Sequence, residues 1–470
     1  KNSIAKLLNN FTTFNNCRYC YPLICLTIFF FYNQVLGLSG FLTGAAAMLA
    51  LIVDAVTDPM IGQLSDRYQS RLGRRHPFMI IGTLSFGFAI SMLFNPPQDL
   101  STNNLFFWLL GWAILTRLFL TFFFVPHLAL GAEIVSGYHE KTALISYRAF
   151  FSYSGQLVIL FVGFIFFFPP PEGMLDISSY TPFGIFAGIL ASIAMLISIF
   201  STYSFIPTLP KPSGNPEATH PILGFITVFK TLKHYSFRIL FLATLLFMVL
   251  AGVTQTLLIY VGTYLFHFTA EDMGIISISL IIGIIFAPSL ARQISLMVDK
   301  KNTLAICVIA GSLIAFSPQL LYLSGIIQIL EINTRVILVF LTNGISQAFF
   351  IAYIIMVDSM LTDTIDEHEL NTGRREEGLY FSARSLATKA SYGLGSFIAG
   401  ISLDIIKFPR GMSVIDINAE SLISLSVLAG PISMILFMLT VVITNKYSLN
   451  QKKHDEILLQ IKRNSLNKEQ

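Results

Sequence analysis

Twelve long apolar stretches limit what this chain can fold into. A membrane-spanning helix needs about 20 mostly apolar residues, and runs of about that length follow one another along most of the sequence. The predicted spans are Tyr19–Gly37, Gly40–Leu64, Phe78–Phe94, Leu105–Ile134, Tyr147–Phe168, Phe183–Phe205, Arg238–Leu265, Gly274–Val298, Leu304–Leu323, Val336–Met360, Leu379–Leu403 and Ser421–Ile443. Charged residues make up 12% of the chain, about half the share of a soluble protein. The chain is therefore predicted to be an all-α membrane protein with twelve transmembrane helices, which excludes a soluble enzyme and a disordered chain.

A polar segment rich in proline divides the predicted spans into six and six. The expected parts are an N-terminal half at 1–205, a cytoplasmic linker at 206–235, a C-terminal half at 236–445 and a cytoplasmic tail at 446–470. Within the linker, Ile222–Lys233 is either an interfacial helix or an extended connection. Two six-helix halves joined by a cytoplasmic linker are typical of a secondary transporter whose site lies between them.

The two halves resemble each other weakly in sequence. Each is expected to end a helix on an acid, Glu133 in the first half and Asp358 in the second. Each then continues through a polar loop with a threonine and an arginine, at Thr142 and Arg148 or at Thr372 and Arg374. The likeness is either an internal repeat or a coincidence between two cytoplasmic loops.

Lysine and arginine are concentrated in alternate loops, and such basic loops mark the cytoplasmic side of a membrane. The opposite loops hold only Arg335, Lys407 and Arg410. Both termini are therefore predicted to be cytoplasmic, in a monomer embedded in the lipid of the plasma or inner membrane. Because the basic residues follow the membrane face, they do not indicate a nucleic-acid partner.

The sequence contains no element that would make this protein an enzyme. No Gly-Lys dipeptide occurs, so a phosphate-binding Walker loop is excluded. The polar loops are short and hold no nucleophile–base pair and no metal-ligand spacing. No cofactor is expected, and transport would depend on an ion gradient or on simple facilitation.

Two acids lie inside the second predicted span, where a charge is expensive. Asp54 and Asp58 are four residues apart, so their side chains share one face of the helix. Two ionised carboxylates at that separation repel, unless a cation lies between them or one is protonated. Pro59 removes the hydrogen bond to the carbonyl of Ala55, which leaves a further oxygen nearby. Hard cations prefer such oxygen ligands, so the segment predicts a sodium or proton site; the alternative is a purely structural ion pair.

Other intramembrane polar groups are possible partners of these acids. Arg117 and Thr121 lie one turn apart in the fourth span, where Thr121 could complete a cation site. Arg117 could pair with an acid or hold an anionic group of a substrate. Arg148 is expected to open the fifth span. Lys389 lies about three turns into the eleventh, where it either faces a cavity or extends to the cytoplasmic surface.

These residues resemble the major facilitator superfamily, and within it the glycoside–pentoside–hexuronide:cation symporters typified by melibiose permease. The superfamily's cytoplasmic loop signature is matched at Gly62, Leu64, Asp66, Arg67, Gly73, Arg74 and Arg75. The symporter branch is resembled by Asp-Ala-x-x-Asp-Pro at 54–59, by the fourth-span pattern at 121–126, by the loop at 363–378 and by Lys389. The resemblance covers all twelve predicted spans.

The resemblance implies roles for particular positions. It assigns the coupling sodium or proton to Asp54, Thr57, Asp58 and Thr121, with Asp54 and Asp58 as the metal ligands if the ion is sodium. It assigns substrate binding to Arg148 and Lys389. Arg117 is added to this group because it lies inside the fourth span, and not because of the resemblance. It implies a cytoplasmic gate at Gly62, Asp66, Arg67, Gly73, Arg74 and Arg75, which would break as the halves move.

The sugar-binding residues of the branch are not all retained. Its acid and tryptophan in the fourth span correspond here to Phe124 and Leu128, and its first-span acid has no counterpart near Arg18 and Tyr19. The expected function is cation-coupled symport of a sugar, glycoside or uronate by alternating access. The alternatives are a sodium-coupled lysolipid-like transporter or a facilitator on the same fold, and a membrane sensor that transports nothing.

Overall fold

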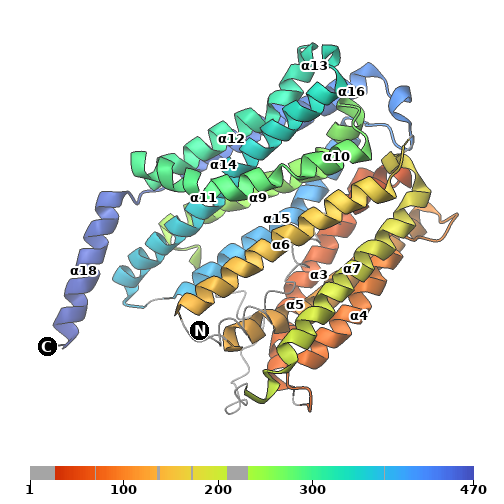
Figure 1. Cartoon of the computed structure of the whole chain (residues 1–470). Coiled ribbons are helices and arrows are strands. Elements are labelled where there is room, and N and C mark those ends of the chain that lie inside the picture. The colour runs from red at the N-terminus through yellow and green to blue at the C-terminus, as the bar shows by residue number, and fades with distance from the viewer. Residues whose placement is uncertain are drawn as a thin grey trace. The chain divides into compact units, whose positions relative to one another are not determined.

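The computed structural model describes residues 27–68, 70–134, 138–170, 173–208, 231–374 and 376–469. Within those ranges the chain is built of helices, and no strand occurs (Figure 1). The helices of the first part are α3 (Gly40–Arg67), α4 (His76–Leu93), α5 (Thr102–Ile134), α6 (Tyr138–Phe167) and α7 (Tyr180–Tyr203). Those of the second part are α9 (Tyr235–Tyr260), α10 (Ala270–Ser277), α11 (Leu280–Met297), α12 (Lys300–Leu323), α13 (Ile326–Ile329), α14 (Ile332–Thr372), α15 (Glu377–Ile405), α16 (Ala419–Val427), α17 (Ser433–Thr444) and α18 (Gln451–Glu469).

Nine helical segments in the described part of the chain are long and apolar enough to cross a membrane. They correspond to the second, third, fourth, sixth, seventh, eighth, ninth, tenth and twelfth predicted spans. Helices α6 and α15 occupy the fifth and eleventh, whereas the first span is described only from Thr27 onward. The all-α membrane fold is confirmed, and the count of twelve stays a prediction.

The described chain forms two compact units. The first consists of the residues up to Pro221 with Thr269–Gly274 and Ser396–Ile417, and the second of Ile222–Phe268, Ile275–Gly395 and Asn418–Gln470. The predicted halves at 1–205 and 236–445 are continuous stretches of sequence, whereas each unit combines separate stretches. The end of α15 packs in the first unit although it belongs to the second half of the sequence.

Close helix crossings hold the first unit together. Helix α4 packs against α5 and α7, and α3 packs against α5. A Cβ atom at Gly82 would lie 2.7 Å from the carbonyl oxygen of Phe119, and one at Gly87 would lie 2.8 Å from that of Gly188. Small residues let helix backbones approach in this way where lipid supplies no hydrophobic driving force.

Helix α3 is fixed at its N-terminal end by α15. Asp404 accepts hydrogen bonds from the backbone N–H groups of Gly40 (3.1 Å) and Phe41 (2.7 Å), and Arg410 pairs with Asp404 at 2.7 Å. A carboxylate at a helix N-terminus satisfies unpaired donors and the helix dipole. Just inside, a Cβ at Gly40 would lie 2.3 Å from the carbonyl oxygen of Gly400. These contacts anchor the N-terminal end of α3, the helix that carries the paired acids.

The second unit has an aromatic core. Helix α14 packs against α11 and α12, and α17 packs against α9 and α12. The ring of Phe247 stacks on that of Tyr353 with centroids 4.0 Å apart and meets Phe437 edge to face at 5.4 Å. Aromatic pairs of this geometry add about 0.5–1.5 kcal/mol each to the burial of their area.

Two predicted cytoplasmic loops are wrong. Helix α6 begins at Tyr138, so Thr142 and Arg148 lie within a helix and Arg148 does not open it. Helix α14 runs from Ile332 to Thr372 without interruption, so Asp358 lies inside it and the following polar residues are helical. Both helices continue past their apolar part, which hydropathy alone does not detect. Most of the predicted segment Ile222–Lys233 lies outside the described residues.

Candidate functional site

Helix α3 presents the two acids. Its N-terminus is capped by Ser39, whose hydroxyl accepts from the N–H of Leu42 at 3.1 Å. The helix continues through Pro59 to Arg67, and the proline ring leaves one main-chain carbonyl in the preceding turn without its helical donor. Asp54 is 8% exposed. The acid pair is thus held on a regular helix beside a freed main-chain oxygen.

Thr121 on α5 lies between the two acids. Its Oγ1 is 2.9 Å from Asp54 Oδ1 and 2.9 Å from Asp58 Oδ1, and its side chain is buried. A hydroxyl carries one hydrogen and can donate to one acceptor at a time. The two carboxylates therefore compete for the one hydroxyl hydrogen, and a bound cation or an added proton would relieve that competition. This arrangement fits a hard monovalent cation or a proton.

Arg117, one turn earlier on α5, extends this cluster. Its Nη1 lies 3.4 Å from Asp54 Oδ2, and each of the two side chains is 11% exposed. The pairing of Arg117 with one of the acids, one of the two possibilities left open by the sequence, is the contact observed. Asp54 therefore has one carboxylate oxygen on Thr121 and the other on Arg117.

Thr57 lies on the neighbouring edge of α3. Its hydroxyl donates to the main-chain carbonyl of Asp54 at 3.3 Å, so its lone pairs remain available to a cation. In the described part of the chain no group of three or more histidine, cysteine, aspartate or glutamate side chains could hold a metal. Any metal ion at this site would depend on two acids together with hydroxyl and carbonyl oxygens.

The predicted substrate residues are distributed over several elements. Arg117 lines a cavity of the first unit together with Ile28, Phe29, Thr43, Ala47, Leu109, Ala113 and Ser396. Lys389 is half-buried on α15, in the other unit. The side chain of Arg148 lies outside the described residues. Phe123, one of the fourth-span aromatics, is buried and stacks on His127 at 5.2 Å, which is a packing role.

The predicted gate residues form a cluster at the end of α3. Arg75 pairs with Asp66 at 3.0 Å, and Arg74 and Arg75 both pair with Glu133 at the end of α5. Gly73 has a φ of +78°, which a glycine adopts without strain. A Cβ built at Gly62 would lie 3.4 Å from Val125 Cγ1, an ordinary van der Waals contact, and Arg67 is exposed. These contacts join α3, α4 and α5 within one unit.

Glu133 was not predicted as a member of this cluster. In the second unit, an acid that pairs with a base in a similar way was not predicted either. Asp363 on α14 binds Lys300 at the start of α12, with Nζ–Oδ distances of 2.8 and 2.7 Å. His454 on α18 lies 3.7 Å from Asp363 and 3.0 Å from Asp366. In both units an acid near the end of one helix thus pairs with a base near the start of an earlier one. If the two halves are an internal repeat, which stays a prediction, Asp363 rather than Asp358 would be the counterpart of Glu133.

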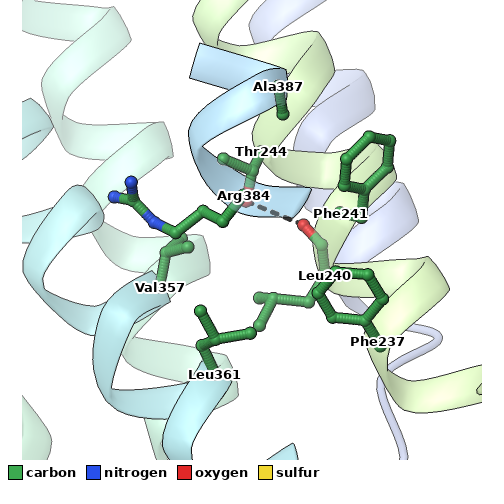
Figure 2. Close-up of a pocket in the computed structure, with 8 residues that line it drawn as sticks. All are labelled: Phe237, Leu240, Phe241, Thr244, Val357, Leu361, Arg384 and Ala387. Atoms are coloured by element: carbon green, nitrogen blue, oxygen red, sulfur yellow. Dashed lines mark hydrogen bonds between the residues drawn. The ribbon is translucent and has the colours of Figure 1, made fainter. Parts of the chain in front are cut away.

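Asp358 instead pairs with Arg384 of α15. Figure 2 shows the stem of Arg384 beside Val357 and its guanidinium directed away from Phe237 and Phe241. The hydroxyl of Thr244 in the same pocket donates to the carbonyl of Leu240 at 2.7 Å and is thereby satisfied by its own helix. The pocket is therefore an apolar packing space, and the ion pair lies beside it.

Comparison with known proteins gives consistent matches. The model of a family described as "MFS/sugar transport protein" matches residues 16–451. The putative glycoside/cation symporter YagG of Escherichia coli is 22% identical over 95% of this chain and 92% of its own. The isoprimeverose transporter of Lactiplantibacillus pentosus is 24% identical over 82% and 77%. Among solved structures, a D-xylose–proton symporter superposes with a TM-score of 0.60 at 15% identity, covering 96% of this chain and 98% of that one, which is a likeness of fold.

Proposed function

The chain belongs to the MFS/sugar transport protein family, among its glycoside–pentoside–hexuronide:cation symporters, and from this premise we propose that it carries a sugar, glycoside or uronate together with a sodium ion or proton. It is an integral membrane transporter and not an enzyme. The observation that supports coupling is the contact of Thr121 with both Asp54 and Asp58.

Coupling follows from the electrostatics of the two acids. Without a coupling ion, the two carboxylates share the hydroxyl hydrogen of Thr121 and repel each other across it, a repulsion that the pairing of Asp54 with Arg117 reduces. A proton or sodium ion removes that repulsion and lets α3 and α5 close around the site. Only then would the cavity shape that accepts substrate be favoured, since a ligand shifts a conformational equilibrium by its differential affinity for the two states. Substrate and cation would then cross together by alternating access.

The substrate assignment rests on charge and on the relatives. Relatives are named for an isoprimeverose, for raffinose and for lactose, all sugars. We assign substrate contacts to Arg117, Arg148 and Lys389, whose charges suit hydroxyls and a uronate carboxylate. The Asp66–Arg74–Arg75 cluster, with Gly62, Arg67 and Gly73, is assigned to a cytoplasmic gate in a monomer of the cell membrane.

Uptake into proteoliposomes tests this function. The panel is radiolabelled xylose, isoprimeverose, lactose, raffinose and glucuronate, each driven by an inward sodium gradient, by a proton gradient or by neither. We expect at least one sugar to accumulate above its external concentration under one gradient, and Asp58→Asn to abolish the accumulation. The matched control is Asp455→Asn on the exposed face of α18. Accumulation that is unchanged in Asp58→Asn would contradict the proposal.

A facilitator on the same fold is the second candidate, favoured by the ion pair between Arg117 and Asp54. In that case the acids stabilise the helix packing and carry no coupling ion. The same assay separates the two functions, because a facilitator equilibrates its substrate and never accumulates it.

A further inference from the structure

Arg117 places a fixed positive charge at the acid to which the coupling ion is assigned. Its guanidinium contacts Asp54 Oδ2 at 3.4 Å, and both side chains are almost fully buried. Water and salt screen such a pair far less than a surface pair. An external cation that binds Asp54 must therefore either displace Arg117 or share the same carboxylate with it.

A sodium ion and a proton meet this obstacle differently. Sodium keeps its full charge and needs several oxygen ligands, so it would lie beside the guanidinium as a second positive charge. A proton forms a covalent O–H bond with one carboxylate oxygen and occupies no coordination sphere. On Asp58, rather than on the acid that pairs with Arg117, it also supplies a further hydrogen to the cluster in which Thr121 Oγ1 meets two carboxylates at 2.9 Å each: the hydroxyl then donates to Asp54 and accepts from Asp58.

We propose that Arg117 selects the coupling ion. Its guanidinium neutralises the charge of Asp54, so that sodium does not bind and the pair of acids accepts a proton instead. The proposal rests on the proposed cation coupling, because it concerns which ion the same site accepts. It makes Arg117 a specificity residue of the ion site in addition to its assignment to the substrate.

Thermal unfolding of the purified full-length protein in NaCl, with KCl at equal ionic strength as reference, tests the proposal without knowledge of the substrate. A ligand that binds the folded state raises the apparent melting temperature by mass action. We expect the unchanged protein to melt at the same temperature in the two salts. Arg117→Gln should gain a sodium-specific upward shift that saturates, with an apparent affinity for Na⁺ at least about ten-fold above the upper limit that the absence of a shift sets for the unchanged protein, equivalent to about 1.4 kcal/mol.

Three further variants make the result specific. Arg117→Lys keeps the positive charge and should show no sodium shift. Arg384→Gln removes a different arginine from an intramembrane ion pair with Asp358, and it should show none either. Adding Asp58→Asn to Arg117→Gln should abolish the gained shift. Monodisperse elution of each variant establishes that it is folded.

Two outcomes would overturn the proposal. One is a sodium-specific shift in the unchanged protein equal to that of Arg117→Gln. The other is a folded Arg117→Gln variant, or a folded Arg117→Ala variant, that responds to NaCl and KCl alike. Neither result bears on the proposed sugar transport, which the uptake assay tests separately. Conversely, a sodium shift gained by Arg117→Gln in a protein that accumulates no sugar would support ion selection and contradict the proposed transport.

Discussion

Thr121 is the side chain that contacts both acids of the proposed ion site. Its hydroxyl lies 2.9 Å from each carboxylate and is buried. Removing one partner of a buried hydrogen-bonded group costs about 1–3 kcal/mol, so Thr121→Val should weaken the apparent affinity for the coupling ion by about ten- to a hundred-fold. Thr121→Ser keeps the hydroxyl and should stay within a few-fold. The measurement is uptake as a function of ion concentration; equal effects of valine and serine would show that the methyl group matters instead.

The predictability of the site also differs from residue to residue. Asp54 and Asp58 could be placed on one face from their spacing, because a helix brings residues four apart together. The pairing of Asp358 with Arg384 could not, since these residues lie on α14 and α15 and no helical period relates them. For Glu133, the sequence predicted only that an acid lies at the end of a helix. Its two arginine partners depend on how α4 and α5 pack.

At the scale of elements, the crossing of α3 with α15 should tolerate no side chain. A Cβ at Gly40 would lie 2.3 Å from Gly400 O, and backbone atoms cannot give way as a flexible side chain does. Gly40→Val should therefore lower the apparent melting temperature by several degrees, as overpacking typically costs about 1–3 kcal/mol. The matched control is Gly111→Val on α5, where nothing lies within 4 Å of the added atom. Equal melting temperatures of the two variants would show that α15 does not press on α3.

The cap of α9 should make stability depend on pH. His234 accepts from the N–H of Phe237 through Nδ1, and burial lowers its pKa despite the opposing charge of Glu367, with His368 lowering it further. A histidine whose pKa is lower in the folded state takes up its proton more readily when unfolded, so stability is lost as the pH falls below about 6.5. A protonated Nδ1 also cannot accept the capping hydrogen bond.

His234→Asn tests this cap, because asparagine caps helices well and does not titrate. Between pH 7.5 and 5.5, its melting temperature should fall less than that of the unchanged protein. Some slope should remain, since burial and Arg335 lower the pKa of His267 as well, and His234→Asn/His267→Asn should be flatter still. Parallel curves for the unchanged protein and His234→Asn would contradict the assignment.

Element boundaries follow from hydropathy only inside the membrane. The apolar runs at Phe78–Phe94 and Leu304–Leu323 correspond to α4 and α12 within a few residues. The polar ends of α14 and α6 were predicted as loops because hydropathy indicates which residues lie within the membrane and does not indicate whether polar residues beyond it are helical. Helix formation there needs only good propensity and tertiary support, such as the contacts of Asp363 and Asp366 with Lys300 and His454.

For the whole molecule, the parity of the number of spans decides where the two ends of the chain lie. The nine apolar spans with α6 and α15 make eleven helices of spanning length in the described residues. An odd number would place the ends on opposite sides of the membrane. The predicted first span at Tyr19–Gly37, described from Thr27 onward, makes the number even. The basic residues of the tail at 446–470 and of the loop after α3 predict the cytoplasmic side for that tail and that loop.

Reporter fusions measure this parity directly. Green fluorescent protein, which fluoresces only when it folds in the cytoplasm, is fused in turn ahead of Lys1 and after Gln470, and alkaline phosphatase, active only outside, is fused after Gln470. We expect fluorescence from both ends and no phosphatase activity, because twelve spans return the chain to its starting side. Phosphatase fused after Asp99, in a loop free of lysine and arginine, should be active and is the positive control. Fluorescence from one end alone would reduce the membrane domain to an odd number of spans, and the first apolar run would then lie on the membrane instead of crossing it.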